Sequence, residues 1–140
     1  MAQSAALVKA AAAFLAVGAG GAIGSMLRYA VTLWMVEKIG PGFPWHTALI
    51  NVVGSFLIGV VAVYAQSSIG LSPAVGTFAV IGVLGGFTTF STFSYDTITL
   101  IADGAGGLAF AYCVGTVVLG LSAAVAGMAL ARIALHAASG

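Results

Sequence analysis

Four long apolar stretches dominate the sequence, at residues 10–36, 47–65, 73–100 and 108–130. Each is long enough to cross a hydrocarbon core of about 30 Å as a helix. Short segments rich in turn-forming or polar residues separate them, among them 40–44, with two prolines and two glycines, and 66–70. The pattern predicts an all-α integral membrane protein, a single domain of four spans over residues 1–140.

The first apolar stretch also has features of a secretory signal peptide, with Lys9 as a thin basic region. However, its apolar character continues past Arg28 and does not stop at a plausible cleavage site. Gly20 and Gly24 form a G-xxx-G pair, which lets membrane helices approach closely. We therefore expect a packed membrane span in preference to a cleaved leader.

The third apolar stretch is longer than a span requires, since residues 73–100 would measure about 42 Å as a continuous helix. It contains the pair Gly85 and Gly86, followed by a cluster of Thr, Ser and Phe. A break near the glycine pair would shorten the helix and release backbone carbonyls. Irregular backbone at this depth is tolerated only where it is buried in protein or lines a cavity, and such half-helix ends often hold ions. We predict a third helix that is broken in mid-membrane.

The composition agrees with a membrane protein. Hydrophobic residues make up 61% of the chain and charged residues 5%, and the mean hydropathy is +1.18. A soluble domain has about 25% charged residues. The expected surroundings are therefore the lipid bilayer, and the net charge of +1 gives no basic surface for nucleic acid.

The basic residues do not select one orientation in the membrane. With four spans, Lys9 and Arg132 fall on one side, and Lys38 on the other, with Arg28 near that end of the first span. The positive-inside rule is then undecided. We hypothesise that the chain inserts both ways round and pairs with an inverted copy; the alternative is one orientation selected by weaker signals.

Several polar residues lie inside the predicted spans, where they need a partner or a cavity. Arg28 either snorkels to the interface, ties helices together or attracts anions at a pore mouth. Thr47, Asn51 and Ser55 form one stripe on the second span, at i, i+4 and i+8. Such residues often join helices by hydrogen bonds, but the two donors and the acceptor of Asn51 favour a cavity.

Aromatic residues give the third span a further candidate property. Phe87, Phe90 and Phe93 recur every three residues, a spacing that is usually explained by packing. Because an aromatic ring has a positive edge, these side chains could also contact an anion. No nucleophile–base pair or metal-ligand cluster is present, so we expect no enzyme activity.

The motifs together closely resemble the Fluc (CrcB) family of fluoride channels. The matching elements are residues 20–24 (GGAIG) with Arg28 and Tyr29, residues 51–56 (NVVGSF) and residues 85–93 (GGFTTFSTF). The resemblance implies an antiparallel, dual-topology homodimer in a bacterial cell membrane. Its two pores would carry fluoride passively out of the cytoplasm and confer fluoride resistance.

The resemblance also implies particular site residues. A structural Na⁺ at the dimer centre would be held by the backbone carbonyls of Gly85 and Thr88 from each subunit. Thr47 and Arg28 would lie at a pore mouth or tie helices together. The implied fluoride pore is lined by the ring edges of two phenylalanines, an amide and hydroxyls, from Phe90, Phe93, Asn51, Tyr112, Thr116, Ser91 and Thr92.

Three positions depart from the family pattern or have no derived role. Gly120 stands where a hydroxyl can continue the pore lining, after Tyr112 and Thr116. His46 replaces a usual glycine, and is either a pH-sensitive charge near one mouth or an interfacial side chain with no role in conduction. Asp96 matches an acidic vestibule position.

Two other classes of membrane protein compete with a channel. Small four-span drug exporters need a membrane-embedded carboxylate for proton exchange, and the first span here carries Arg28 and no acid. A membrane scaffold would explain the G-xxx-G pair but would leave Asn51 and the Thr/Ser cluster without partners.

Overall fold

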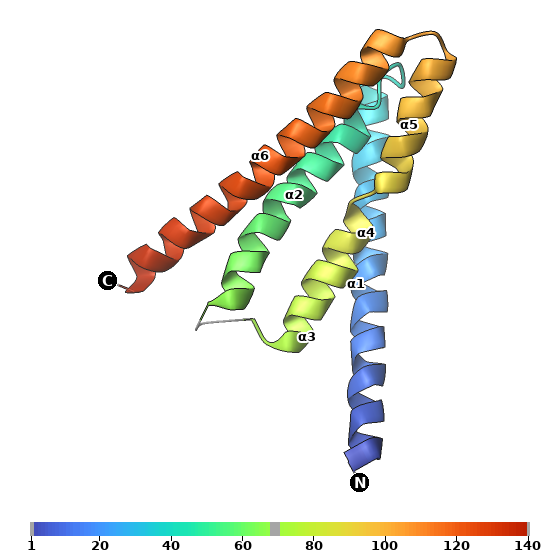
Figure 1. Cartoon of the computed structure of the whole chain (residues 1–140). Coiled ribbons are helices and arrows are strands. Elements are labelled where there is room, and N and C mark those ends of the chain that lie inside the picture. Colours follow the sequence, from blue (N-terminus) through green and yellow to red (C-terminus); the bar gives the residue numbers. More distant parts are fainter. Residues whose placement is uncertain (1, 68–70, 140) are drawn as a thin grey trace.

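A computed structural model describes residues 2–67 and 71–139, which form helices and no strand (Figure 1). Four of its helical segments are long and apolar enough to cross a membrane, which confirms the predicted number of spans: Ala6–Ile39, Trp45–Gln66, Pro73–Ala102 and Gly106–Ala138. Part of the predicted polar break at 66–70 lies outside the described residues. The elements in chain order are α1 (Ala2–Ile39), α2 (Trp45–Gln66), α3 (Pro73–Gly76), the π-helical segment η1 (Thr77–Leu84), α4 (Gly85–Phe87), α5 (Phe90–Ala102) and α6 (Gly106–Ser139).

Two glycines with positive φ terminate helices at the tight connections. Gly40 (φ 89°) follows α1, and its N–H donates to Val36 O at 2.9 Å. Gly104 (φ 77°) lies between α5 and α6. A residue with a Cβ adopts this conformation only at a cost, so glycine allows both chain reversals. Both termini lie away from the end of the molecule that holds these two connections (Figure 1).

The third span is interrupted, as predicted, but just beyond the glycine pair. Gly85 and Gly86 remain helical in α4, and the backbone becomes extended at Thr88 (ψ 159°) and Thr89 (φ −153°, ψ 114°). Helix resumes at Phe90. The interruption thus lies near Gly85 and Gly86, as expected, but begins two residues after Gly86, and packing against α1 explains why the glycines themselves stay helical.

Glycines on α1 face glycines of η1 and α4 at very short range. A Cβ on Gly20 would lie 2.6 Å from Phe78 O, and one on Gly82 would lie 2.9 Å from the Gly20 Cα. A Cβ on Gly86 would lie 2.6 Å from Gly21 O. Gly86 is thus needed inside a regular helix, where it lets two backbones touch. The predicted packing role of the G-xxx-G pair on α1 is confirmed.

The helices pack in two groups. In one, α2 packs on α6; in the other, α1 packs on η1 and α4. Most large apolar side chains remain exposed, including Phe14, Leu27, Ile98 and Leu121. A soluble protein rarely leaves so much apolar surface open, whereas lipid or a partner subunit covers it in a membrane. A small aromatic core forms where α5 meets α6, around Phe93, Leu100, Ala109 and Tyr112.

We predict that Gly20→Ala destabilises the protein, because the new methyl group meets the η1 backbone. Overpacking of this kind costs roughly 1–3 kcal/mol. Thermal unfolding in detergent measures the effect. Gly18→Ala is the matched control, since a Cβ at Gly18 has nothing within 4 Å. Equal melting temperatures for the two variants would contradict the close α1–η1 contact.

Candidate functional site

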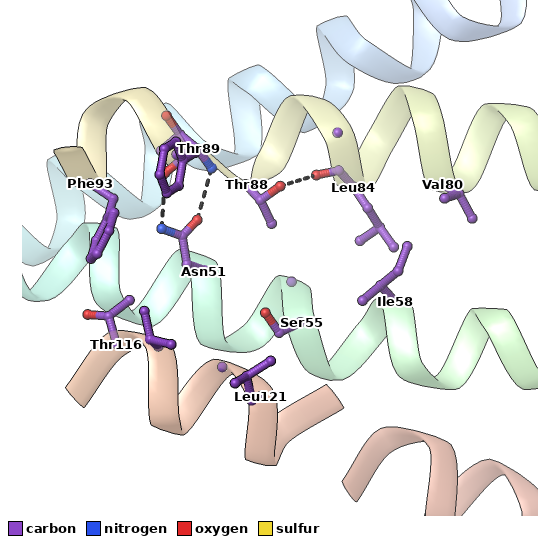
Figure 2. Close-up of a pocket in the computed structure, with 15 residues that line it drawn as sticks. Asn51, Ser55, Ile58, Val80, Leu84, Thr88, Thr89, Phe93, Thr116 and Leu121 are labelled. Carbon is purple, nitrogen blue, oxygen red and sulfur yellow. Dashed lines mark hydrogen bonds between the residues drawn. The ribbon is translucent and has the colours of Figure 1, made fainter. Parts of the chain in front are cut away.

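The side-chain amide of Asn51 holds the backbone at the helix interruption (Figure 2). Its Nδ2 donates to Thr89 O at 3.0 Å, and its Oδ1 accepts from Thr89 N at 2.9 Å. The amide therefore replaces a helical peptide group and satisfies both backbone groups of Thr89. One Nδ2 hydrogen remains beyond these two bonds.

Thr89 also caps the helix that follows the interruption. Its Oγ1 accepts from Thr92 N at 3.2 Å and donates to Thr92 Oγ1 at 2.9 Å, and Ser91 Oγ lies 3.3 Å from it. Thr is a favoured N-cap residue for this reason. The first N–H groups of α5 carry a partial positive charge, so the interruption is electropositive on its α5 side.

On its other side, the interruption frees backbone carbonyls. In an uninterrupted helix Thr89 N would bond to Gly85 O and Thr92 N to Thr88 O. Those two N–H groups instead donate to Asn51 Oδ1 and Thr89 Oγ1. The carbonyls of Gly85 and Thr88 thereby lose their regular helical donors, and these are the two carbonyls predicted to bind sodium.

A cavity of about 470 Å³ lies beside the interruption, between α2, α6 and the halves of the third span. It brings together six predicted site residues, namely Asn51, Gly85, Thr88, Phe90, Phe93 and Thr116. Ser55, Thr89 and Gly120 also line it, and its remaining wall is mainly apolar. This mixture of a few polar groups and many apolar ones is typical of a binding or permeation site.

Few of the hydroxyls at this cavity have a free donor. Thr88 Oγ1 donates to Leu84 O at 2.9 Å, and Thr89 Oγ1 donates to Thr92. Thr116 is buried, and within the described part of the chain its hydroxyl has no hydrogen bond. The cavity therefore presents the hydroxyls of Thr116 and Ser55 and the spare Asn51 N–H to whatever occupies it.

The two phenylalanines of the cavity differ sharply in exposure. Their ring centroids are 5.7 Å apart with an interplanar angle of 39°. Phe93 is 8% exposed within the aromatic core, whereas Phe90 is 79% exposed. Phe93 is therefore fixed by this chain alone, while Phe90 stands at the open side of the cavity.

Tyr112 lies outside the two cavities described here. It is 2% exposed, and its hydroxyl donates to Asp96 Oδ2 at 3.1 Å. Its ring packs on Phe93 at 5.3 Å and on Phe43 at 5.6 Å. In this structure Tyr112 supports Phe93 and gives Asp96 a partner, while its hydroxyl is already engaged.

A second cavity, of about 300 Å³, lies between α1, the start of α2 and the start of α5. Arg28, Thr47 and Thr92 line it, and so does His46. Arg28 has no ion pair or hydrogen bond with the described residues. Thr47 is 1% exposed, and its Oγ1 has no protein hydrogen-bond partner in the described structure.

The sequence reasoning missed several groups at these cavities. Thr89 lines both cavities and was given no role of its own. Ser25 and Thr32 line the second cavity beside Arg28. Their spacing of i, i+3 and i+7 is a polar stripe on an apolar helix, a signal that could have identified them.

Cavities that combine a few polar groups with apolar walls at an interrupted helix, inside a chain with four apolar spans, are typical of a membrane protein that passes or binds a small solute. Comparison with known proteins identifies which kind. The family described as CrcB-like protein, Camphor Resistance (CrcB), matches residues 15–128, and the chain belongs to this family.

Individual relatives agree with that assignment. The chain is 52% identical over 118 residues to the fluoride-specific ion channel FluC of Rhizobium meliloti. The aligned region covers 84% of this chain and 94% of the relative. The chain is 47% identical over 116 residues to the protein of that name from Agrobacterium fabrum, with 83% and 93% covered. For Thermus thermophilus FluC the identity is 44% over 117 residues, with 84% and 91% covered.

The family and the four spans make the chain a multi-pass protein of a bacterial cell membrane. The family is one of channels and not of enzymes. The prediction of no enzyme activity is thereby confirmed.

We predict that Asn51→Leu lowers thermal stability, because it leaves Thr89 N and Thr89 O without partners. Buried unsatisfied groups of this kind cost about 2 kcal/mol. Thermal unfolding in detergent measures the loss. The control is Gln66→Leu, which removes an exposed amide that donates only to Ala62 O in its own helix. A melting temperature of Asn51→Leu equal to that of the control would show that the amide does not hold the interruption.

Proposed function

We propose that the protein is a passive, fluoride-selective channel that lets fluoride leave the cytoplasm and thereby confers fluoride resistance. The single observation that carries this proposal is the cavity at the interruption, where Phe90 and Phe93 stand beside a spare Asn51 donor. The printed names of its relatives support fluoride as the ion.

The lining chemistry suits a small anion. A fluoride ion that enters the cavity must exchange water for protein donors, and unpaired charge in an apolar site is very costly. Ring edges carry partial positive charge, and the amide of Asn51 and the hydroxyl of Thr116 donate hydrogen bonds. These neutral groups can bind an anion without trapping it, a requirement for conduction.

The second cavity supports a role as the mouth of the pathway. Arg28, without an anionic partner among the described residues, supplies positive potential that raises the local anion concentration. The hydroxyls of Thr47 and Thr92 line the same space. Thr89 lines both cavities and so lies between the proposed mouth and the proposed pore. Of the two functions predicted for Arg28, attraction of anions fits better than a tie between helices.

The proposed structural sodium fits the residues at the interruption. Gly85 and Thr88 offer carbonyl oxygens released from helical bonding, and hard cations prefer oxygen ligands. No group of three His, Cys, Asp or Glu side chains that could hold a metal occurs in the described ranges 2–67 and 71–139. Sodium, when bound, would neutralise these carbonyl dipoles and stabilise the interruption.

An inverted homodimer would complete both the proposed sodium site and the open side of the cavity at Phe90. Two carbonyls from one chain make half of a cation site, and a two-fold axis would supply the other half. Phe90, 79% exposed at the open side of the cavity, would gain a cover from the second subunit. The proposed dimer has two pores, one associated with each chain. The balance of Lys and Arg between the two sides supports insertion in both orientations.

We predict that liposomes containing the wild-type protein release fluoride rapidly and retain chloride, as read with ion-selective electrodes. Phe90→Ile should lower the fluoride rate by about tenfold, because an aromatic contact contributes up to about 1.5 kcal/mol. The substitution keeps apolar bulk and removes the ring edge.

Phe14→Ile is the matched control for this measurement. Phe14 is 79% exposed, as Phe90 is, but it lies on α1 outside both cavities. The control should release fluoride at the wild-type rate. Fluoride retention by folded wild-type protein would overturn the channel proposal, and an unchanged rate for Phe90→Ile would remove Phe90 from the pathway.

We predict that cysteines at opposite ends of the third span crosslink between subunits, if the dimer is inverted. Val75 and Ile98 are 47% and 64% exposed near the two ends of that span. Val75→Cys and Ile98→Cys are made separately in a Cys113→Ala background and given different tags. After co-expression and treatment with a short bifunctional reagent, the doubly tagged dimer should form.

Each variant expressed alone serves as the control, because an inverted dimer keeps identical positions on opposite sides of the membrane. Crosslinks confined to identical positions would show a parallel arrangement and exclude the inverted dimer.

A further inference from the structure

Ser55, on α2, places a free hydroxyl at the first cavity. It lies one helical turn beyond Asn51, is half-buried and lines the cavity. A serine in a helix often donates to the carbonyl four residues earlier, as Ser94 does to Phe90 O at 2.9 Å. Within the described residues the Ser55 hydroxyl makes no such bond. Its donor is therefore free.

The helix that faces Ser55 contributes no hydroxyl at this level. Thr116 lines the cavity from α6, but one turn further along α6 the chain has Gly120. A Cβ on Gly120 would lie 3.4 Å from Ser55 Oγ and 4.0 Å from Ser55 Cβ. The glycine thus opens a space on α6 that the Ser55 hydroxyl faces from α2.

The position of Ser55 along the cavity gives this donor its importance. Figure 2 shows Asn51, Thr89 and Thr116 toward one end of the cavity and Ile58 and Val80 toward the other, with Ser55 between them. The labelled lining residues toward that end are apolar, namely Leu84, Ile58 and Val80. An anion that moves from Asn51 and Thr116 toward this end meets Ser55 as the next free donor. Without it, the anion would lose its hydrogen bonds before reaching water.

We propose that Ser55 donates a hydrogen bond to the permeating fluoride and, from α2, replaces the hydroxyl that α6 lacks at Gly120. The inference rests on the proposed channel function and adds a residue to its pathway. It also predicts that the hydroxyl can be moved, since a serine at position 120 would occupy the same space from the opposite helix.

The experiment compares fluoride release from liposomes containing the full-length wild type, Ser55→Ala, Gly120→Ser and the double variant Ser55→Ala/Gly120→Ser. Loss of a hydrogen bond to an ion should lower the rate of Ser55→Ala by about tenfold. The double variant should recover most of the wild-type rate, because truncation at Ser55 makes room for the new side chain. Ser122→Ala, an exposed serine on α6 that lines neither cavity, is the control and should match the wild type.

A purely structural role for Ser55 predicts a different pattern, in which thermal stability falls with the rate and Gly120→Ser does not restore conduction. That pattern, or a wild-type rate for Ser55→Ala, would overturn the inference while the wild type still conducts. Fluoride retention by the wild type would instead overturn the channel function and this inference with it. If Ser55→Ala does not fold, Ser55→Cys tests the same point with a similar volume and a much weaker donor, and its rate should fall likewise.

Discussion

The reciprocal pair of hydrogen bonds between the Asn51 amide and the Thr89 backbone is the interaction on which the rest of the site depends. Inside a membrane, a helix can be interrupted only if its freed backbone groups find partners. Asn51 supplies a donor and an acceptor in the geometry of a peptide group, so Thr89 can leave the helix at little cost. The same bond takes away the N–H on which the Gly85 carbonyl would otherwise depend. Asn51 thus frees the Gly85 carbonyl, while Thr89, whose backbone Asn51 holds, caps α5 and frees the Thr88 carbonyl.

Glycine packing determines where this interaction can occur. Gly82 and Gly86 bring η1 and α4 into contact with α1, which requires the backbone to stay helical up to Phe87. On α2, Gly54 leaves room for the Thr88 side chain, which a Cβ there would overlap. The interruption is therefore confined to the two residues that follow the glycine contact and face Asn51. The glycine contacts therefore do not interrupt the helix themselves, but they determine where the interruption occurs.

These contacts explain how far the sequence could predict the structure. Four spans follow from the length and hydropathy of the apolar stretches, which need no knowledge of tertiary contacts. The interruption was predictable from the Thr/Ser cluster, but its position depends on Gly86 meeting Gly21, and no local pattern reveals that contact. Asn51 was predicted to face a cavity and does so, but its amide is also bonded to a segment 38 residues away. Tyr112 was predicted as a pore hydroxyl, whereas its partner Asp96 and its stacking on Phe93 arise from the packing of α5 on α6.

Physical reasons can be given for where the charge and the free hydrogen-bond donors lie along the proposed pathway. A cationic side chain inside the cavity would bind a small anion tightly and slow its exit, and Arg28 lies instead in the second cavity, at the proposed mouth. Most hydroxyls near the interruption are already engaged, Thr88 with its own helix and Thr89 with Thr92. The free donors are therefore few and neutral, and Asn51, Ser55 and Thr116 come from two facing helices. Because each donor offers a single hydrogen bond, an ion could pass from one donor to the next without being bound tightly by any of them. In the proposed channel, selection for an anion and rapid passage would both follow from these few groups.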